Sequence, residues 1–145
     1  MKELENQIVG YCTSLHEWNA SYEEYAKSVG LSYTSLNLLS ALCHLENCTQ
    51  KMLCEQCFLP KQTVNAVVTS FYKKGWVRLE ELPEDRRNKV IRFTPEGRAE
   101  ADRILEKTRK SEWCAMESLT EEERSALLSL TRRYVAACKQ AMKEL

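Results

Sequence analysis

The chain has 145 residues, with 21 lysines and arginines balanced by 21 aspartates and glutamates, so its formal net charge at pH 7 is zero. No apolar run is long enough to cross a membrane and the N-terminus has no signal-peptide core, so we expect a cytoplasmic protein and exclude a membrane-spanning one. The length predicts a single domain, residues 1–145. In a reducing compartment, the seven cysteines are expected to be thiols without disulfide bonds.

The chain contains only four glycines and three prolines, which predicts a mostly helical structure. Apolar residues recur every three or four positions from Leu4 to Val29, and this spacing predicts a first helix that ends at Gly30. Ser32 can cap a second helix that reaches about Glu46.

Two shorter helices are predicted next. Thr49 can cap a helix from Gln50 to Cys57, and Pro60 suits the first turn of another helix. That helix runs to Lys74, and Gly75 stops it. The pair has the pattern of a helix-turn-helix.

A two-stranded ribbon follows, because apolar and polar residues alternate at 76–81 and again at 88–93. The connecting tip, 82–87, is polar and charged. Thr94 and Pro95 then start a long helix that continues to about Met116. A helix-turn-helix followed directly by a basic ribbon is the layout of a winged-helix DNA-binding protein.

The last helix is predicted to begin at a capping box formed by Thr120 and Glu123. Its apolar stripe is expected to be buried. The first helix carries a similar stripe, and one chain of this length can cover the two only in part, so we expect a symmetric homodimer. The stripe of the last helix comprises Leu127, Leu130, Tyr134, Cys138 and Met142.

The basic residues gather between Lys61 and Arg98. Nine lysines and arginines stand there against five acidic residues, a net charge of +4, so the rest of the chain carries −4. A basic region with acidic flanks fits a protein that neutralises phosphates at one place on its surface.

The second helix of a helix-turn-helix lies in the major groove, with its N-terminal residues against base edges. The polar side chains at these positions can pair with bases, and those further along can meet phosphates. Val64, Val67, Val68 and Phe71 are expected on the opposite face, toward the core. Taken alone, the pattern also fits an ordinary amphipathic helix with a solvated polar face. The predicted base-contacting residues are Lys61, Gln62, Thr63 and Asn65, and the predicted phosphate-contacting residues are Ser70 and Lys73.

The tip of the ribbon has no packing reason to be basic, yet Arg86, Arg87 and Lys89 cluster there. Such a tip can enter the minor groove, whose negative potential attracts arginine. Asp85 is expected to orient a neighbouring arginine through a carboxylate–guanidinium pair.

The segment DRRNKVIRFT, 85–94, followed by PEGR, 95–98, resembles the wing signature of the multiple-antibiotic-resistance regulator (MarR) family. The resemblance covers nearly the whole chain. It implies a mainly α fold with a β-hairpin wing, a winged helix-turn-helix lobe at 31–98, and dimerisation through the long terminal helices at 1–30 and 99–145. It also implies a pseudo-palindromic operator, with Asp85 fixing the wing and Arg87 in the minor groove.

The cysteines allow three interpretations. Cys54 and Cys57 form a CxxC that lacks the strand–helix context of a thioredoxin site, so packing toward the core is expected. The cysteines and His44 between 43 and 57 match no standard zinc spacing, and no metal or cofactor is predicted. Cys12 is the candidate redox residue, because the peroxide-sensing branch of the family uses a cysteine in its first helix, although about one turn earlier.

Aromatic side chains of the helices form a candidate pocket for a small apolar effector, although helical aromatic stripes are often plain core. The family resemblance supports the hypothesis of an effector pocket, but it does not identify the ligand. The candidate residues are Tyr11, Trp18, Tyr22, Tyr33 and Trp113.

The sequence therefore predicts a transcriptional regulator, a repressor by expectation, that binds double-stranded DNA as a homodimer and is released by a small ligand or by thiol oxidation. The alternative is a winged-helix protein-interaction module that does not bind DNA. An enzyme is not predicted, because the chain has no nucleophile–base pair, no phosphate loop and no convincing pair of carboxylates.

Overall fold

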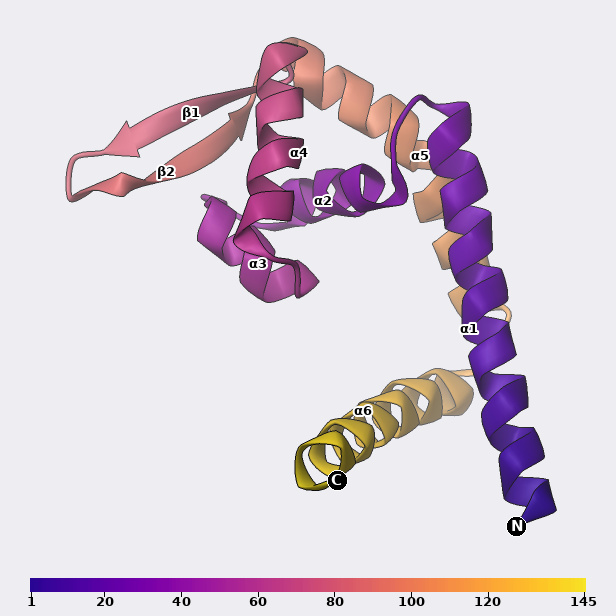
Figure 1. Ribbon diagram of the computed structural model, residues 1–145. Helices are drawn as coiled ribbons and strands as arrows, with labels where there is room; N and C mark the ends of the chain where they lie inside the picture. The colour runs from indigo at the N-terminus through magenta and orange to yellow at the C-terminus, as the bar shows by residue number, and fades with distance from the viewer. The chain divides into compact units, whose positions relative to one another are not determined.

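The computed structural model describes residues 1–145 and shows six α-helices and one two-stranded antiparallel sheet (Figure 1). The chain divides into two compact units, Met1–Ile104 and Leu105–Leu145. No helix has the length and apolar character needed to span a membrane. In chain order the elements are α1 (Lys2–Ser28), α2 (Tyr33–His44), α3 (Gln50–Cys57), α4 (Lys61–Lys73), β1 (Val77–Leu82), β2 (Asp85–Phe93), α5 (Pro95–Glu117) and α6 (Glu121–Glu144).

The helix boundaries follow the capping residues. Gly30, with φ of 77°, ends α1 in the left-handed conformation that favours glycine. The Ser32 hydroxyl accepts a hydrogen bond from the Ser35 N–H at 3.0 Å, and the Thr49 hydroxyl accepts one from the Met52 N–H at 3.2 Å. The predicted caps of α2 and α3 are therefore confirmed, and α3 has its predicted bounds.

The core of the first unit lies between the helix pair α3–α4, helix α2 and the base of the hairpin. Burying a side chain of leucine or valine size stabilises a fold by roughly 1.5–3 kcal/mol, so this cluster positions the helix pair. Tyr25 of α1 also donates a hydrogen bond to the Ile104 carbonyl of α5. The fully buried side chains of the first unit include Leu38, Leu39, Cys48, Leu53, Val64, Val68, Phe71, Val90 and Ile104.

The turn between α3 and α4 differs from the prediction at Pro60. Pro60 is the residue before the helix, with ψ of 149°, rather than a residue of its first turn. Its carbonyl accepts the hydrogen bond from the Val64 N–H at 3.2 Å. Either position suits a residue that has no N–H, so the sequence could not separate the two. Phe58 ends α3 in the left-handed region, with φ of 53°.

The hairpin is longer and its turn tighter than predicted. Leu82 pairs with Asp85, so only Pro83 and Glu84 lie between the strands. The predicted tip at 82–87 was wrong, because Asp85, Arg86 and Arg87 belong to β2. Both faces of a ribbon are solvated near its tip, so strands there do not need the apolar alternation on which the prediction depended.

The base of the hairpin is joined to α3 and to α5. Thr49 and Val90 form an isolated β-bridge, and the Ile91 N–H donates to the Cys48 carbonyl at 2.7 Å. On the other side, the Thr94 N–H donates to the Trp76 carbonyl at 3.0 Å. The bridge and the Ile91 bond hold the base of the hairpin against the start of α3, and the Thr94 bond closes the hairpin where α5 begins.

Gly97 lies in the first turn of α5, directly against the backbone of Trp76. A Cβ atom added at Gly97 would come within 1.8 Å of the Trp76 carbonyl oxygen. The Thr94 hydroxyl bonds on both sides of this contact, donating to the Gly75 carbonyl at 2.6 Å and accepting from the Gly97 N–H at 3.0 Å. Only glycine fits at this close approach of two backbones.

The second unit contains α6, which begins at the predicted capping box. The Thr120 hydroxyl accepts from the Glu123 N–H, and the Glu123 carboxylate accepts from the Thr120 N–H. Within the single chain α6 has no buried residue, so the burial of its stripe in a homodimer stays a prediction. The large exposed apolar residues of α6 include Leu127, Leu128, Leu130, Tyr134, Val135 and Met142.

Candidate nucleic-acid interface

Helix α4 presents a polar face to solvent because its apolar residues are used by the core. Val64, Val68 and Phe71 are almost fully buried, which turns the opposite side outward. Val67, also predicted to face the core, is only half-buried. Of the residues predicted to contact DNA from α4, Lys61, Gln62, Asn65, Ser70 and Lys73 are exposed and Thr63 is half-buried.

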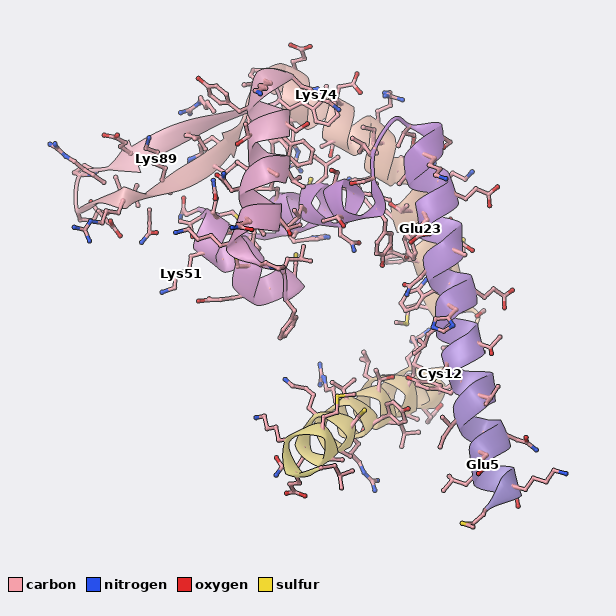
Figure 2. All side chains as sticks on the ribbon, in the orientation of Figure 1. Glu5, Cys12, Glu23, Lys51, Lys74 and Lys89 are labelled. Carbon is pink, nitrogen blue, oxygen red and sulfur yellow. The ribbon has the colours of Figure 1, made fainter.

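A groove of about 530 Å³ runs between this helix pair and the hairpin. Its sides carry Lys51 of α3 and Lys89 of β2, both labelled in Figure 2. Four cationic side chains and one carboxylate line it, so the groove is strongly basic and suits a phosphate-rich ligand. The lining residues are Gln50, Lys51, Cys54 and Glu55 of α3, Lys61 of α4, and Leu79, Arg87, Asn88 and Lys89 of the hairpin.

The groove brings together Lys61, Arg87 and Lys89, which the sequence analysis placed on two separate elements. Arg86 is exposed but does not line it. The sequence predictions did not include Gln50 and Lys51, because they placed only the second helix of the pair against DNA. The spacing of the α3 groove residues at 50, 51, 54 and 55 follows one helical face and could have indicated them.

Asp85 holds the turn of the hairpin. Its carboxylate accepts hydrogen bonds from the Arg87 N–H at 3.0 Å, the Asn88 N–H at 3.4 Å and the Asn88 side-chain amide at 2.9 Å. These bonds lower the pKa of Asp85, the Asn88 side chain contributing most. The predicted carboxylate–guanidinium pair was wrong: Asp85 orients the backbone of Arg87, because a short aspartate side chain reaches its own following N–H groups more readily than a long guanidinium.

Three basic residues of the hairpin form ion pairs with glutamates of β1. Glu80 accepts a hydrogen bond from the Arg92 guanidinium at 2.8 Å, which lowers the pKa of Glu80, and lies 3.8 Å from that of Arg78. Lys89 lies 3.8 Å from the Glu81 carboxylate. Exposed pairs of this kind are weak, so a phosphate can replace Glu81 as the partner of Lys89 at little cost.

The candidate effector residues are only partly gathered. Tyr22 stands edge-on to Tyr33 with ring centroids 6.0 Å apart, and Trp18 lies 5.8 Å from Tyr22. Tyr11 is half-buried earlier in α1, and Trp113 belongs to the second unit, where it is exposed. The structure thus brings together three of the five predicted aromatics.

No disulfide bond joins the seven cysteines, and no group of three metal-binding side chains is gathered anywhere in the chain. Cys12, the candidate redox residue, is half-buried on α1 (labelled in Figure 2). Cys54 was expected to face the core, but it lines the basic groove, and the fully buried position of α3 is taken by Leu53 instead.

Burial and the neighbouring Cys57 thiol raise the pKa of Cys48 from 9.0 to about 11, and burial next to Cys54 raises that of Cys57. At pH 8, about 0.1% of the Cys48 thiols are then ionised.

The order in which the cysteines react tests this assignment. With iodoacetamide and peptide mass spectrometry, we expect the exposed Cys114 to be alkylated first and Cys48 last. Labelling in denaturant should remove the difference, and equal rates in the folded chain would contradict the assignment. A raised thiol pKa contributes stability below pH 9, and this contribution disappears as pH rises towards 11.

The amino-acid sequence matches a family model and a characterised regulator. A model of the MarR family matches residues 29–88. The HTH-type transcriptional regulator SarZ of Staphylococcus haemolyticus is 33% identical over 96 residues, a match that spans 65% of this chain and 65% of SarZ.

Two solved structures resemble nearly the whole chain. A probable transcriptional regulator from Pseudomonas aeruginosa is 28% identical with a TM-score of 0.66, covering 90% of this chain and 98% of the other. A regulator from Neisseria meningitidis described with the same family name is 21% identical with a TM-score of 0.81, covering 95% and 97%. At 21% identity, the match to the Neisseria meningitidis protein shows a shared fold.

Proposed function

We propose that the chain, a member of the MarR family, is a sequence-specific DNA-binding transcriptional regulator, and the proposal rests on this membership and on the basic groove. The observation that carries the proposal is the gathering of Lys51, Lys61, Arg87 and Lys89 around one groove beside the exposed polar face of α4. A helix that presents polar side chains beside a basic hairpin has the chemistry to contact base edges and phosphates together.

In the proposed complex, α4 enters the major groove and the hairpin follows the backbone into the adjacent minor groove. The winged helix-turn-helix lobe spans 31–98, and residues 1–30 and 99–145 form the dimerisation region. Exposed apolar residues on α1, among them Leu4, Ile8 and Val9, and the exposed stripe of α6 support the homodimer, because both need covering. Two copies of α4 would then read a pseudo-palindromic operator in the cytoplasm.

We further propose that the protein is a repressor released by an effector. The cluster of Trp18, Tyr22 and Tyr33 supports a small apolar ligand, and Cys12 on the same helix supports thiol oxidation as the second possibility. Either event would act by favouring a state in which the spacing of the two recognition helices no longer fits the operator.

The test is selection of bound duplexes from a random DNA pool by the reduced protein, followed by an anisotropy titration. We expect pseudo-palindromic sequences with half-sites about 10 base pairs apart, bound with a Kd of about 10⁻⁸ M or tighter and steeply weakened by salt. The same titration with an organic hydroperoxide, on wild type and Cys12→Ser, tests the oxidation route. Selection of no sequence would contradict the proposal, and recovery of a stable protein partner instead would favour the interaction module.

A further inference from the structure

Gln50, the first residue of α3, makes a side-chain contact with the recognition helix. Its Nε2 donates a hydrogen bond to Oδ1 of Asn65 at 3.3 Å, which joins α3 to the exposed face of α4. Gln50 also lines the basic groove, and Asn65 follows Lys61 by one helical turn. The contact therefore lies at the surface proposed to meet the bases.

The residues next to Gln50 are anchored in the fold. The Thr49 hydroxyl caps α3 by accepting from the Met52 N–H, and Thr49 forms the bridge to Val90 of the hairpin. Leu53, one turn later, is fully buried. A side chain on so constrained a backbone can act as a fixed donor, as the supporting residues of a recognition site must.

The bond changes what Asn65 can offer to DNA. An asparagine recognises adenine by using its amide oxygen and amide nitrogen together, accepting from N6 and donating to N7. Gln50 engages the Asn65 oxygen from the α3 side and thereby orients the amide. This leaves the Asn65 Nδ2 group, with two N–H donors, as the part available to a base.

We infer that Gln50 is a positioning residue that makes Asn65 a hydrogen-bond donor toward DNA. This inference rests on the proposed DNA-binding function and deepens it. The favoured partner of Asn65 is a base edge with acceptors only, guanine O6 and N7 or thymine O4, rather than adenine or the donor of cytosine.

Two substitutions of Gln50 test whether Asn65 offers its amide nitrogen or its amide oxygen to the base. Gln50→Leu removes the donor at similar size, and Gln50→Glu replaces it by an acceptor that can bind Asn65 Nδ2 and turn its oxygen to the DNA.

The experiment is DNA selection and titration with wild type, the two Gln50 variants, Asn65→Ala, and Gln50→Leu combined with Asn65→Ala. In wild type we expect guanine or thymine at the base that depends on Asn65. Gln50→Leu should reduce discrimination there by about three- to tenfold, the worth of one hydrogen bond. Gln50→Glu should shift the preference towards adenine or cytosine, and Gln50→Leu should have no further effect in the Asn65→Ala background.

A uniform loss of affinity for all sequences in Gln50→Leu, or an equal effect in the Asn65→Ala background, would show that Gln50 contacts DNA itself and would overturn the inference. A second readout needs no DNA: the NMR signals of the Asn65 side-chain amide should shift in Gln50→Leu, and unchanged signals would overturn the contact. A wild-type protein that selects no DNA overturns the proposed function and this inference with it, whereas normal selection with unchanged discrimination overturns the inference alone.

Discussion

Replacing Gly97 with alanine is expected to destabilise the protein more than the same replacement at any of the other three glycines. The new Cβ would come within 1.8 Å of the Trp76 carbonyl oxygen and 2.5 Å of two further Trp76 backbone atoms. Backbone atoms held by the Thr94 hydrogen bonds cannot move aside as a flexible side chain would. Overpacking costs about 1–3 kcal/mol, and a backbone clash belongs at or above the top of that range. We expect the Tm, followed by circular dichroism, to fall by roughly 10 °C.

The matched control is Gly10→Ala in α1, where nothing lies within 4 Å of an added Cβ. Alanine favours a helix interior over glycine by about 1 kcal/mol, so this variant should melt at the same temperature or slightly higher. The two substitutions are chemically identical, which leaves the contact with Trp76 as the difference between them. Equal Tm values for Gly97→Ala and Gly10→Ala would mean that the junction of hairpin and α5 is not as described.

Arg87→Ala is expected to weaken operator binding at least tenfold. Arg87 lines the basic groove, and its backbone N–H donates to the Asp85 carboxylate, so we expect its guanidinium to meet DNA from an ordered strand. A hydrogen bond to a charged group contributes about 1.5–3 kcal/mol, and each homodimer would lose two such arginines. Titrations at several salt concentrations should also show a shallower salt dependence, because the slope falls by about one for each phosphate that the variant no longer neutralises.

Arg86→Ala removes the same charge one residue away and serves as the control. Arg86 is exposed at the end of the hairpin but does not line the groove. We therefore expect its loss to change affinity by less than about threefold, the range of a screened surface charge. If the two variants bind operator DNA equally, or if Arg86→Ala is the weaker binder, the groove is not the surface that contacts DNA.

Local rules predicted the elements whose limits depend on a few neighbouring residues. The Thr49 side chain was enough to place the start of α3, and the pairing of Thr120 with Glu123 was enough to place the start of α6. Such caps are made within one turn of helix, so they can be recognised in the sequence.

Features that depend on packing between elements could not be predicted in the same way. The contact of Gln50 with Asn65 depends on how α3 crosses α4, which no spacing along the chain encodes. The groove position of Cys54 depends on which α3 face Leu53 occupies. The exposed stripe of α6 is a third example. Apolar periodicity predicts that this face of the helix is covered, but it does not identify the surface that covers it.

The attachment of the hairpin has a mechanical consequence. Its base is clamped by the Thr49–Val90 bridge and by the Thr94 hydrogen bonds, whereas Pro83 and Glu84 at its turn are exposed. A ribbon held at one end behaves as a cantilever, so its bending should grow steeply toward the turn. A contact with DNA near the turn must restrain this bending, and that loss of motion offsets part of each contact made there. Charges near the clamp, such as Lys89, should therefore add more to affinity than equal charges at the tip.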